Sequence, residues 1–115
     1  MRIGINGFGR IGRSVFRILE EVDGIDVVAI NDLFDNDALR YLLSYDTVMG
    51  PFRGNLTLED DHFVTDKSRV KLLNERNPAD IPWGELGVDA VVEATGVFQK
   101  REQLEQHLAA GAKYV

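Results

Sequence analysis

Three glycine residues close to the N-terminus constrain the fold of this chain more than any other feature. Gly7, Gly9 and Gly12 follow a short apolar segment that contains Ile3 and Ile5, and they precede apolar residues at helical spacing. In a G-x-G-x-x-G pattern, the first glycine permits a tight turn, the second lets a pyrophosphate approach the backbone, and the third lets the helix pack on the strand. The pattern predicts a strand, a phosphate-binding turn and a helix, although by itself it also fits a glycine-rich turn without a ligand.

An acidic residue follows the next predicted strand at the spacing of a dinucleotide-binding domain. The helix after the glycines is predicted over residues 11–22 and is expected to end at Gly24. Residues 25–30 form a nearly continuous apolar run, which is typical of a parallel strand covered on both faces. Asp32 lies 20 positions after Gly12 (32 − 12 = 20), where such domains carry the carboxylate that accepts the ribose hydroxyls. The alternative roles for Asp32 are a helix cap and a surface carboxylate.

Strands and helices alternate along most of the chain, which predicts an α/β fold with a doubly wound parallel sheet of the Rossmann type. A second helix begins at the capping groups of residues 35–37, a buried strand covers residues 88–92, and a last helix covers residues 100–110. Residues 54–73 alternate and contain two turn pairs, which predicts a small antiparallel β insertion. Because ligands bind at the carboxyl ends of strands in such sheets, the predicted binding segments are residues 6–12, 31–32 and 94–98.

The composition excludes several classes of function. The 115 residues carry a net charge of −6, which argues against the nucleic-acid backbone as a partner. No apolar run approaches the ~20 residues needed to cross a bilayer, and the N-terminus lacks the pattern of a signal peptide. We therefore expect a cytoplasmic protein that binds neither membranes nor nucleic acid. The chain has no cysteine, and its only histidines, His62 and His107, adjoin no nucleophile or metal ligand, so we expect both to be solvent-exposed and predict no metal site.

The segment at residues 6–13, Asn-Gly-Phe-Gly-Arg-Ile-Gly-Arg, is more specific than a general dinucleotide-binding pattern. It resembles the N-terminus of glyceraldehyde-3-phosphate dehydrogenases. Further segments resemble this family in the same order along the chain, at residues 29–33, 42–47, 75–78, 82–89, 93–98 and 111–113. Met49 departs from the family, which usually has His there, and Asn77 stands where the family often has Asp. Both lie outside the predicted phosphate-binding turn, so we interpret them as variation within the family.

The resemblance implies that NAD is the cofactor and assigns roles to the matching positions. The backbone at Arg10 and Ile11 would bind the pyrophosphate, Asp32 the adenosine ribose, and Arg76 would lie at the adenine end. The Asp32 carboxylate would also disfavour the 2′-phosphate of NADP. Phe98 is a candidate for contact with the adenine ring, with a core position as the alternative. The predicted cofactor-binding residues are Gly7, Gly9, Arg10, Ile11, Gly12, Asp32, Arg76, Thr95, Gly96 and Phe98.

The resemblance also implies an activity that these residues cannot perform alone. The family oxidises an aldehyde phosphate to an acyl phosphate with hydride transfer to NAD, by means of a cysteine thiolate and a histidine base. In the family these catalytic residues come after the segment that matches this chain. We therefore interpret residues 1–115 as one dinucleotide-binding domain, truncated before the catalytic domain and inactive by itself, from a homo-oligomeric and, by resemblance, tetrameric parent. The alternatives are a fragment of an erythrose-4-phosphate dehydrogenase, a family that tends to have Glu where Asp32 stands, and a free-standing NAD-binding module.

Overall fold

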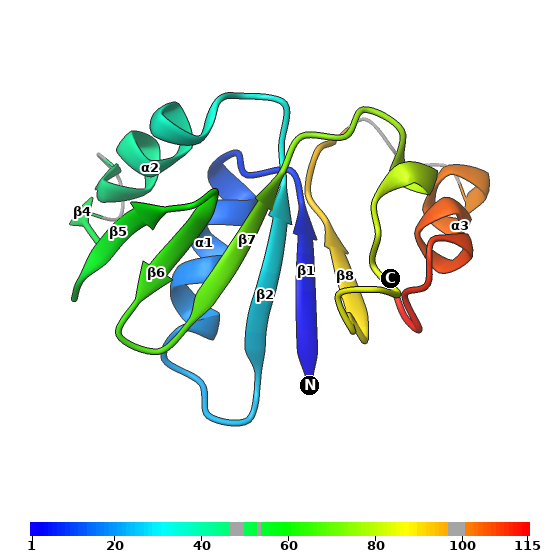
Figure 1. Ribbon diagram of the computed structural model, residues 1–115, viewed down its shortest axis with the longest axis horizontal. Coiled ribbons are helices and arrows are strands. Elements are labelled where there is room, and N and C mark those ends of the chain that lie inside the picture. The colour runs from blue at the N-terminus through cyan, green and yellow to red at the C-terminus, as the bar shows by residue number, and fades with distance from the viewer. Residues whose placement is uncertain (47–49, 53, 97–100) are drawn as a thin grey trace.

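The computed structural model describes residues 1–46, 50–52, 54–96 and 101–115 (Figure 1). The helices are α1 (Arg10–Leu19), α2 (Asn36–Ser44), the short 3-10 helix η1 (Pro78–Asp80) and α3 (Arg101–Ala109). The strands are β1 (Arg2–Asn6), β2 (Asp26–Asn31), β3 (Tyr45–Asp46), β4 (Gly50–Pro51), β5 (Leu56–Glu59), β6 (His62–Thr65), β7 (Arg69–Leu73) and β8 (Ala90–Glu93). No helix in the described part of the chain is both long and apolar enough to span a lipid bilayer.

Six of the strands form one sheet in the order β5-β6-β7-β2-β1-β8. The strands β7, β2, β1 and β8 run parallel to one another, which confirms the predicted Rossmann-type α/β fold. β1 lies inside this parallel part, between β2 and β8. Its register pairs Asn6 with Asn31 of β2 and with Glu93 of β8. The carboxyl ends of three neighbouring strands therefore lie level with one another, at the edge of the sheet where such folds bind ligands.

The antiparallel strands predicted within residues 54–73 are present as β5, β6 and β7. β6 pairs antiparallel with both β5 and β7, whereas β7 also pairs parallel with β2, so these strands extend the main sheet. The turn between β5 and β6 contains Asp60 and Asp61, whose φ angles of 48° and 58° lie in the left-handed region that a type I′ hairpin turn requires. β3 and β4 form a separate two-stranded hairpin that the sequence pattern did not predict.

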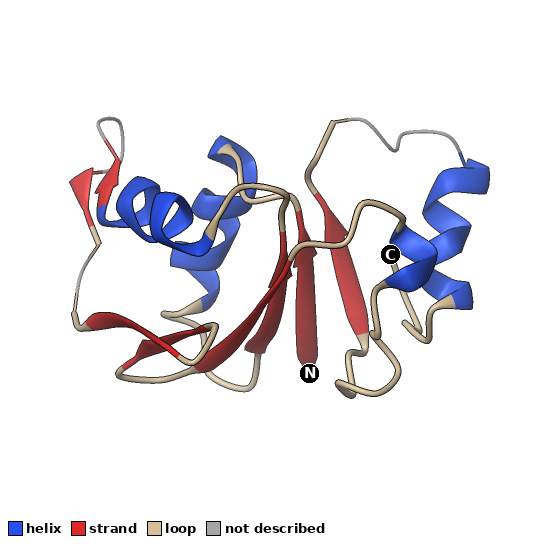
Figure 2. Cartoon of the chain, turned by 45° about the horizontal axis from the view of Figure 1, so that its top comes forward, coloured by secondary structure: helices blue, strands red, loops and turns tan. Residues whose placement is uncertain are grey.

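The sheet separates two apolar cores. Ala29 and Ile30 belong to different cores because successive side chains of a strand point to opposite faces. The larger core combines residues of α1, α2, the sheet and the turn after β1, namely Ile3, Ile5, Phe8, Phe16, Val27, Ile30, Leu39, Leu43, Phe63, Val70 and Leu72. The smaller core consists of Ala29, Ile81, Trp83, Val88, Val91 and Ala112. α1 and α2 accordingly lie together, away from α3 (Figure 2).

The first helix ends earlier than the sequence predicted. α1 ends at Leu19, and the chain then turns through Gly24, with a φ of 83°, before β2 begins. Lys67, which follows β6, donates from Nζ to the backbone carbonyls of Leu19 at 3.0 Å and Ile25 at 2.8 Å, and to that of Val22. A lysine from the turn after β6 therefore binds the last carbonyl of α1 and two carbonyls of the segment that joins α1 to β2.

Candidate functional site

The glycine-rich turn joins β1 to α1 at the carboxyl end of the sheet. Gly7 has a φ of 97°, a conformation that side chains rarely adopt, and its N–H donates to the Asn31 carbonyl at 2.7 Å. A Cβ atom at Gly7 would lie 2.7 Å from the backbone nitrogen of Thr95 and 2.8 Å from the carbonyl carbon of Ala94. The turn after β1 therefore packs directly against the turn after β8, and only glycine leaves room for this contact.

Gly12 and Gly9 differ in how closely other atoms surround them. A Cβ atom at Gly12 would collide with the carbonyl oxygen of Gly7 and lie 3.4 Å from Cγ2 of Ile5, so α1 approaches β1 this closely only with glycine at that position. A Cβ atom at Gly9 would have no heavy atom within 4 Å, and its φ of −75° suits any residue. Nothing in the described part of the chain requires glycine at position 9, and this open space is what close approach of a pyrophosphate requires.

The N-terminus of α1 presents backbone donors beside that open space. Gly9 is the N-cap residue and supplies no side-chain hydrogen bond. The Arg13 N–H donates to the Gly9 carbonyl at 2.9 Å, so the N–H groups of Arg10, Ile11 and Gly12 precede this bond and have no acceptor inside the helix. These donors and the partial positive charge of the helix end favour a bound anion. The residues present therefore fit the pyrophosphate of a dinucleotide.

Asp32 lies directly after β2 and contacts the glycine turn. Its Oδ2 accepts a hydrogen bond from the Phe8 N–H at 2.7 Å, and its Oδ1 accepts one from the Phe34 N–H at 3.0 Å. The residue is half-buried, and each carboxylate oxygen can accept a second hydrogen bond. The carboxylate can therefore hold the turn in place and still accept hydroxyl groups of a ribose.

The remaining predicted residues lie at the same edge of the sheet, where the structure describes them. Arg76 is exposed and follows β7, which is the neighbour of β2. Thr95 is half-buried after β8, and Gly96 is exposed with a φ of 75°. Phe98 lies outside the described residues, as does Met49.

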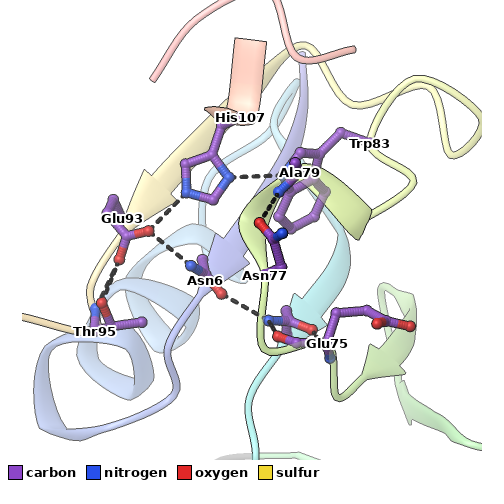
Figure 3. A network of polar contacts seen from close by, with 9 residues as sticks. Asn6, Glu75, Asn77, Ala79, Trp83, Glu93, Thr95 and His107 are labelled. Atoms are coloured by element: carbon purple, nitrogen blue, oxygen red, sulfur yellow. Dashed lines mark hydrogen bonds and ion pairs between the residues drawn. The ribbon is translucent and has the colours of Figure 1, made fainter. Parts of the chain in front are cut away.

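A row of polar side chains crosses the sheet where β2, β1 and β8 end (Figure 3). Asn31 Nδ2 donates to Asn6 Oδ1 at 2.8 Å, and Asn6 Nδ2 donates to Glu93 Oε1 at 2.7 Å. Asn31 also donates to the backbone carbonyl of Glu75 at 2.9 Å and accepts from its N–H at 2.8 Å. Because the bonds to Glu75 determine which way the Asn31 amide faces, they also determine the orientation of the Asn6 amide.

The Glu93 carboxylate accepts further hydrogen bonds from two other parts of the fold. Thr95 donates to Oε2 from its N–H at 3.0 Å and from Oγ1 at 2.7 Å. His107 Nε2 lies 2.7 Å from Oε1, and Trp83 Nε1 donates to His107 Nδ1 at 2.9 Å (Figure 3). Since an indole N–H can only donate, Nδ1 of His107 accepts, and Nε2 carries the proton that is donated to Glu93.

These hydrogen bonds determine the charge state of Glu93. Burial raises the pKa of Glu93, whose side chain is 7% exposed. The hydrogen bonds from His107, Thr95 and Asn6 outweigh burial and leave the pKa of Glu93 below its usual value. The side chain is therefore an ionised acceptor at neutral pH.

The expectation that both histidines are solvent-exposed is wrong for His107. Its side chain is 0% exposed, and both ring nitrogens have partners, as buried polar groups require. His62 is half-buried in β6, with Nδ1 2.6 Å from the Asp60 carbonyl oxygen. The expectation was wrong because it considered only the neighbours of each histidine in the sequence. Trp83 and Glu93 come within hydrogen-bonding distance of His107 only in the folded chain.

Sequence reasoning also did not assign the row formed by Asn31, Asn6 and Glu93. The sequence did contain one indication of this row. Each of its polar residues directly follows an apolar pair or alternation at the end of a predicted strand. Strands that end level in a parallel sheet bring such residues together. The partners on α3 and beside η1 had no comparable signal in the sequence.

Comparison with known proteins identifies the family of this domain. Residues 1–101 match the family model of the glyceraldehyde 3-phosphate dehydrogenase NAD-binding domain. The chain is 52% identical to a glyceraldehyde-3-phosphate dehydrogenase of Streptomyces coelicolor, 50% identical to glyceraldehyde-3-phosphate dehydrogenase 1 of Candida glabrata, and 46% identical to glyceraldehyde-3-phosphate dehydrogenase A of Escherichia coli K12.

Each of these alignments covers 100% of this chain but only 34% or 35% of the relative. The chain thus spans about a third of the length of the curated relatives that it matches. The matched family model includes the glycine turn, Asp32 and the Thr95–Gly96 turn. The chain therefore belongs to the glyceraldehyde-3-phosphate dehydrogenase family, and its residues 1–101 match the NAD-binding domain of that family.

Proposed function

We propose that this chain binds NAD at the carboxyl end of its parallel sheet, with the glycine turn and Asp32 at the centre of the site. The observation that carries the proposal is the N-terminus of α1, where three backbone N–H groups without intrahelical acceptors lie beside the open space at Gly9. The full proposed set is Gly7, Gly9, Arg10, Ile11, Gly12, Asp32, Arg76, Thr95, Gly96 and Phe98.

The chain's own residues bind and orient the cofactor in this proposal. The N–H groups of Arg10 and Ile11 hold the pyrophosphate, and Asp32 accepts hydrogen bonds from the hydroxyls of the adenosine ribose. Arg76 lies on the β7 side of Asp32 and serves the adenine end of the site. When bound, NAD supplies a hydride acceptor.

The parent protein is, in this proposal, a phosphorylating aldehyde dehydrogenase that converts an aldehyde phosphate to an acyl phosphate. The relatives named above carry the name glyceraldehyde-3-phosphate dehydrogenase. The 115 residues contain no cysteine, so a thiolate nucleophile has to come from another part of the parent protein. Asp32, in place of Glu, favours this activity over that of an erythrose-4-phosphate dehydrogenase. We further propose that residues 1–115 act as one NAD-binding domain of a homo-oligomeric parent.

Titration of the ¹⁵N-labelled chain with NAD, followed by NMR and calorimetry, tests the binding site. The expected shifts centre on residues 7–12 and on Asp32, because these groups contact the cofactor. Shifts confined to residues 54–73 would refute the proposed site.

An activity assay tests the proposal that this chain binds NAD while the catalytic nucleophile lies elsewhere in the parent protein. The isolated chain, mixed with glyceraldehyde 3-phosphate, NAD and phosphate, is expected to reduce no more NAD than a boiled control. NAD reduction above that control, in material shown to be free of host enzyme, contradicts the proposal that the nucleophile lies elsewhere in the parent.

A further inference from the structure

We propose that Glu93 is a positioning residue for the cofactor, which holds the turn after β1 and the turn after β8 together and is itself held by His107 and Trp83. The proposal rests on the NAD site proposed above. Nothing in that site assigns a role to Glu93, His107 or Trp83, because none of the three belongs to the set of cofactor-binding residues.

The Glu93 carboxylate lies between the turn after β1 and the turn after β8. One oxygen accepts from Asn6, which directly precedes Gly7, and the other accepts twice from Thr95. The two turns are in contact, since a Cβ atom at Gly7 would lie 2.7 Å from the Thr95 nitrogen. A carboxylate that accepts from both turns determines how they face each other, and both turns contribute to the proposed site.

Two series of hydrogen bonds run toward the Glu93 carboxylate. From one side, the Trp83 indole donates to His107, and His107 donates to Glu93. From the other side, Asn31 donates to Asn6, and Asn6 donates to Glu93. Both series end on the carboxylate, which is the only group of the five that accepts without donating. Its charge is therefore the reason that the donors point inward.

An amide of the same shape cannot replace this acceptor. In Glu93→Gln, the amide nitrogen takes the place of one carboxylate oxygen and donates there instead of accepting. At the Oε2 position it would face the donors of Thr95, and at the Oε1 position it would face those of Asn6 and His107. A rotated Asn6 amide would in turn face the Nδ2 donor of Asn31. Every orientation leaves at least two donors directed at each other.

The Glu93 carboxylate is buried. Its side chain is 7% exposed, and its oxygens accept four hydrogen bonds from the described part of the chain. Glu93 therefore acts on the cofactor through Thr95 and the Gly7 turn. This property distinguishes it from Asp32, whose carboxylate retains acceptor capacity for a ligand.

The test compares NAD binding by the 115-residue chain, its Glu93→Gln variant and its Glu85→Gln variant. Glu85 is exposed in the turn after Trp83, so the control removes the same charge near the same tryptophan. Calorimetry is expected to give at least about tenfold weaker binding for Glu93→Gln, the scale of one lost hydrogen bond to a charged group. Glu85→Gln is expected to bind like the wild type. Equal affinity in all three chains, measured on folded samples, overturns the proposal.

A spectroscopic measurement separates positioning from a general loss of stability. Trp83 is the only tryptophan, so its indole N–H gives a single assignable NMR signal. We expect this signal to move when NAD saturates the wild type and the Glu85→Gln control, because the cofactor acts on Thr95 and hence on Glu93 and His107. It should not respond in Glu93→Gln. A wild-type indole signal that is unaffected by saturating NAD overturns the proposal.

If Glu93→Gln does not fold, a second pair of variants tests the positioning role of Glu93. In His107→Gln, the amide can donate to Glu93 and accept from Trp83, as the imidazole does, whereas His107→Leu removes both bonds. His107 is buried on α3 and is not one of the proposed cofactor contacts. NAD affinity should stay near the wild-type value in His107→Gln and fall at least severalfold in folded His107→Leu. Wild-type affinity in the leucine variant overturns the proposal.

The same experiments keep this inference separate from the proposed NAD site. If the wild type does not bind NAD, or if the shifts omit residues 7–12, the NAD site itself is refuted. If the wild type binds there and Glu93→Gln binds equally well, only the positioning role of Glu93 is refuted.

Discussion

The Asp32 carboxylate accepts a hydrogen bond from the backbone N–H of Phe8 at 2.7 Å. This bond joins the end of β2 to the glycine turn after β1, across 24 positions of the sequence. The residue proposed to recognise the ribose therefore also supports the turn proposed to bind the pyrophosphate. A substitution at Asp32 is expected to affect both functions.

Asp32→Ala should reduce the preference of the chain for NAD over NADP. In the wild type, the 2′-phosphate of NADP would face the Asp32 carboxylate, and like charges a few ångströms apart repel by about 1–4 kcal/mol near a protein surface. Calorimetric titration of both chains with both cofactors measures the preference. Asp37→Ala, which removes an exposed carboxylate from the first turn of α2, should leave the preference unchanged. A wild type that binds NADP as tightly as NAD contradicts this expectation.

Two glycine substitutions should separate cofactor binding from folding. Gly9→Ala places its methyl group in open space and should lower the free energy of unfolding by less than about 1 kcal/mol, the scale of an N-cap change. It should nevertheless weaken NAD binding, because the methyl group occupies the space for the pyrophosphate. Gly12→Ala collides with the Gly7 carbonyl and should cost about 1–3 kcal/mol of stability. Urea denaturation and NAD titration of both variants test the contrast, and equal stability losses in the two variants would contradict it.

Glu93 should make the stability of the fold depend on acid pH. Its pKa is lower in the folded chain than its usual value of 4.5, so the folded state favours the ionised form. This contribution is fully present above pH 4.5 and is lost as the pH falls through the lowered pKa. Glu93→Gln should therefore destabilise the chain at pH 7 and reduce the decline in stability below pH 4.5. Denaturation curves at several pH values measure both effects, and parallel pH profiles for variant and wild type would count against them.

Lys67→Met should destabilise the fold by about 0.5–1.5 kcal/mol, the usual range for a lost hydrogen bond. Methionine keeps most of the length of the side chain but cannot donate to the carbonyls of Leu19, Val22 and Ile25. Lys71→Met, on the exposed side of β7, removes the same charge and serves as the control. Urea denaturation should show a larger loss for Lys67→Met, whereas equal losses would indicate a general effect of charge.

Local patterns predicted the elements that surround the proposed cofactor site. The glycine spacing, the apolar run before Asp32 and the alternation of strands and helices each depend on residues close together in the chain. The same applies to the antiparallel strands of residues 54–73, which alternate and turn within a few positions. The short β3–β4 hairpin was missed because strands of 2 residues each are too short to show an alternation.

The sequence by itself determined the class of fold, the glycine turn after β1 and the acid that follows β2, because backbone conformation and side-chain periodicity act over short distances. Only the tertiary structure decided that Lys67, in the turn between β6 and β7, binds the last carbonyl of α1 and two carbonyls of the segment that follows it. It also decided that His107 is buried and directed at Glu93. The hydrogen bonds that place Glu93 between the two turns join residues up to 87 positions apart, and such contacts exist only once the level strands and the packed helices bring their partners within reach.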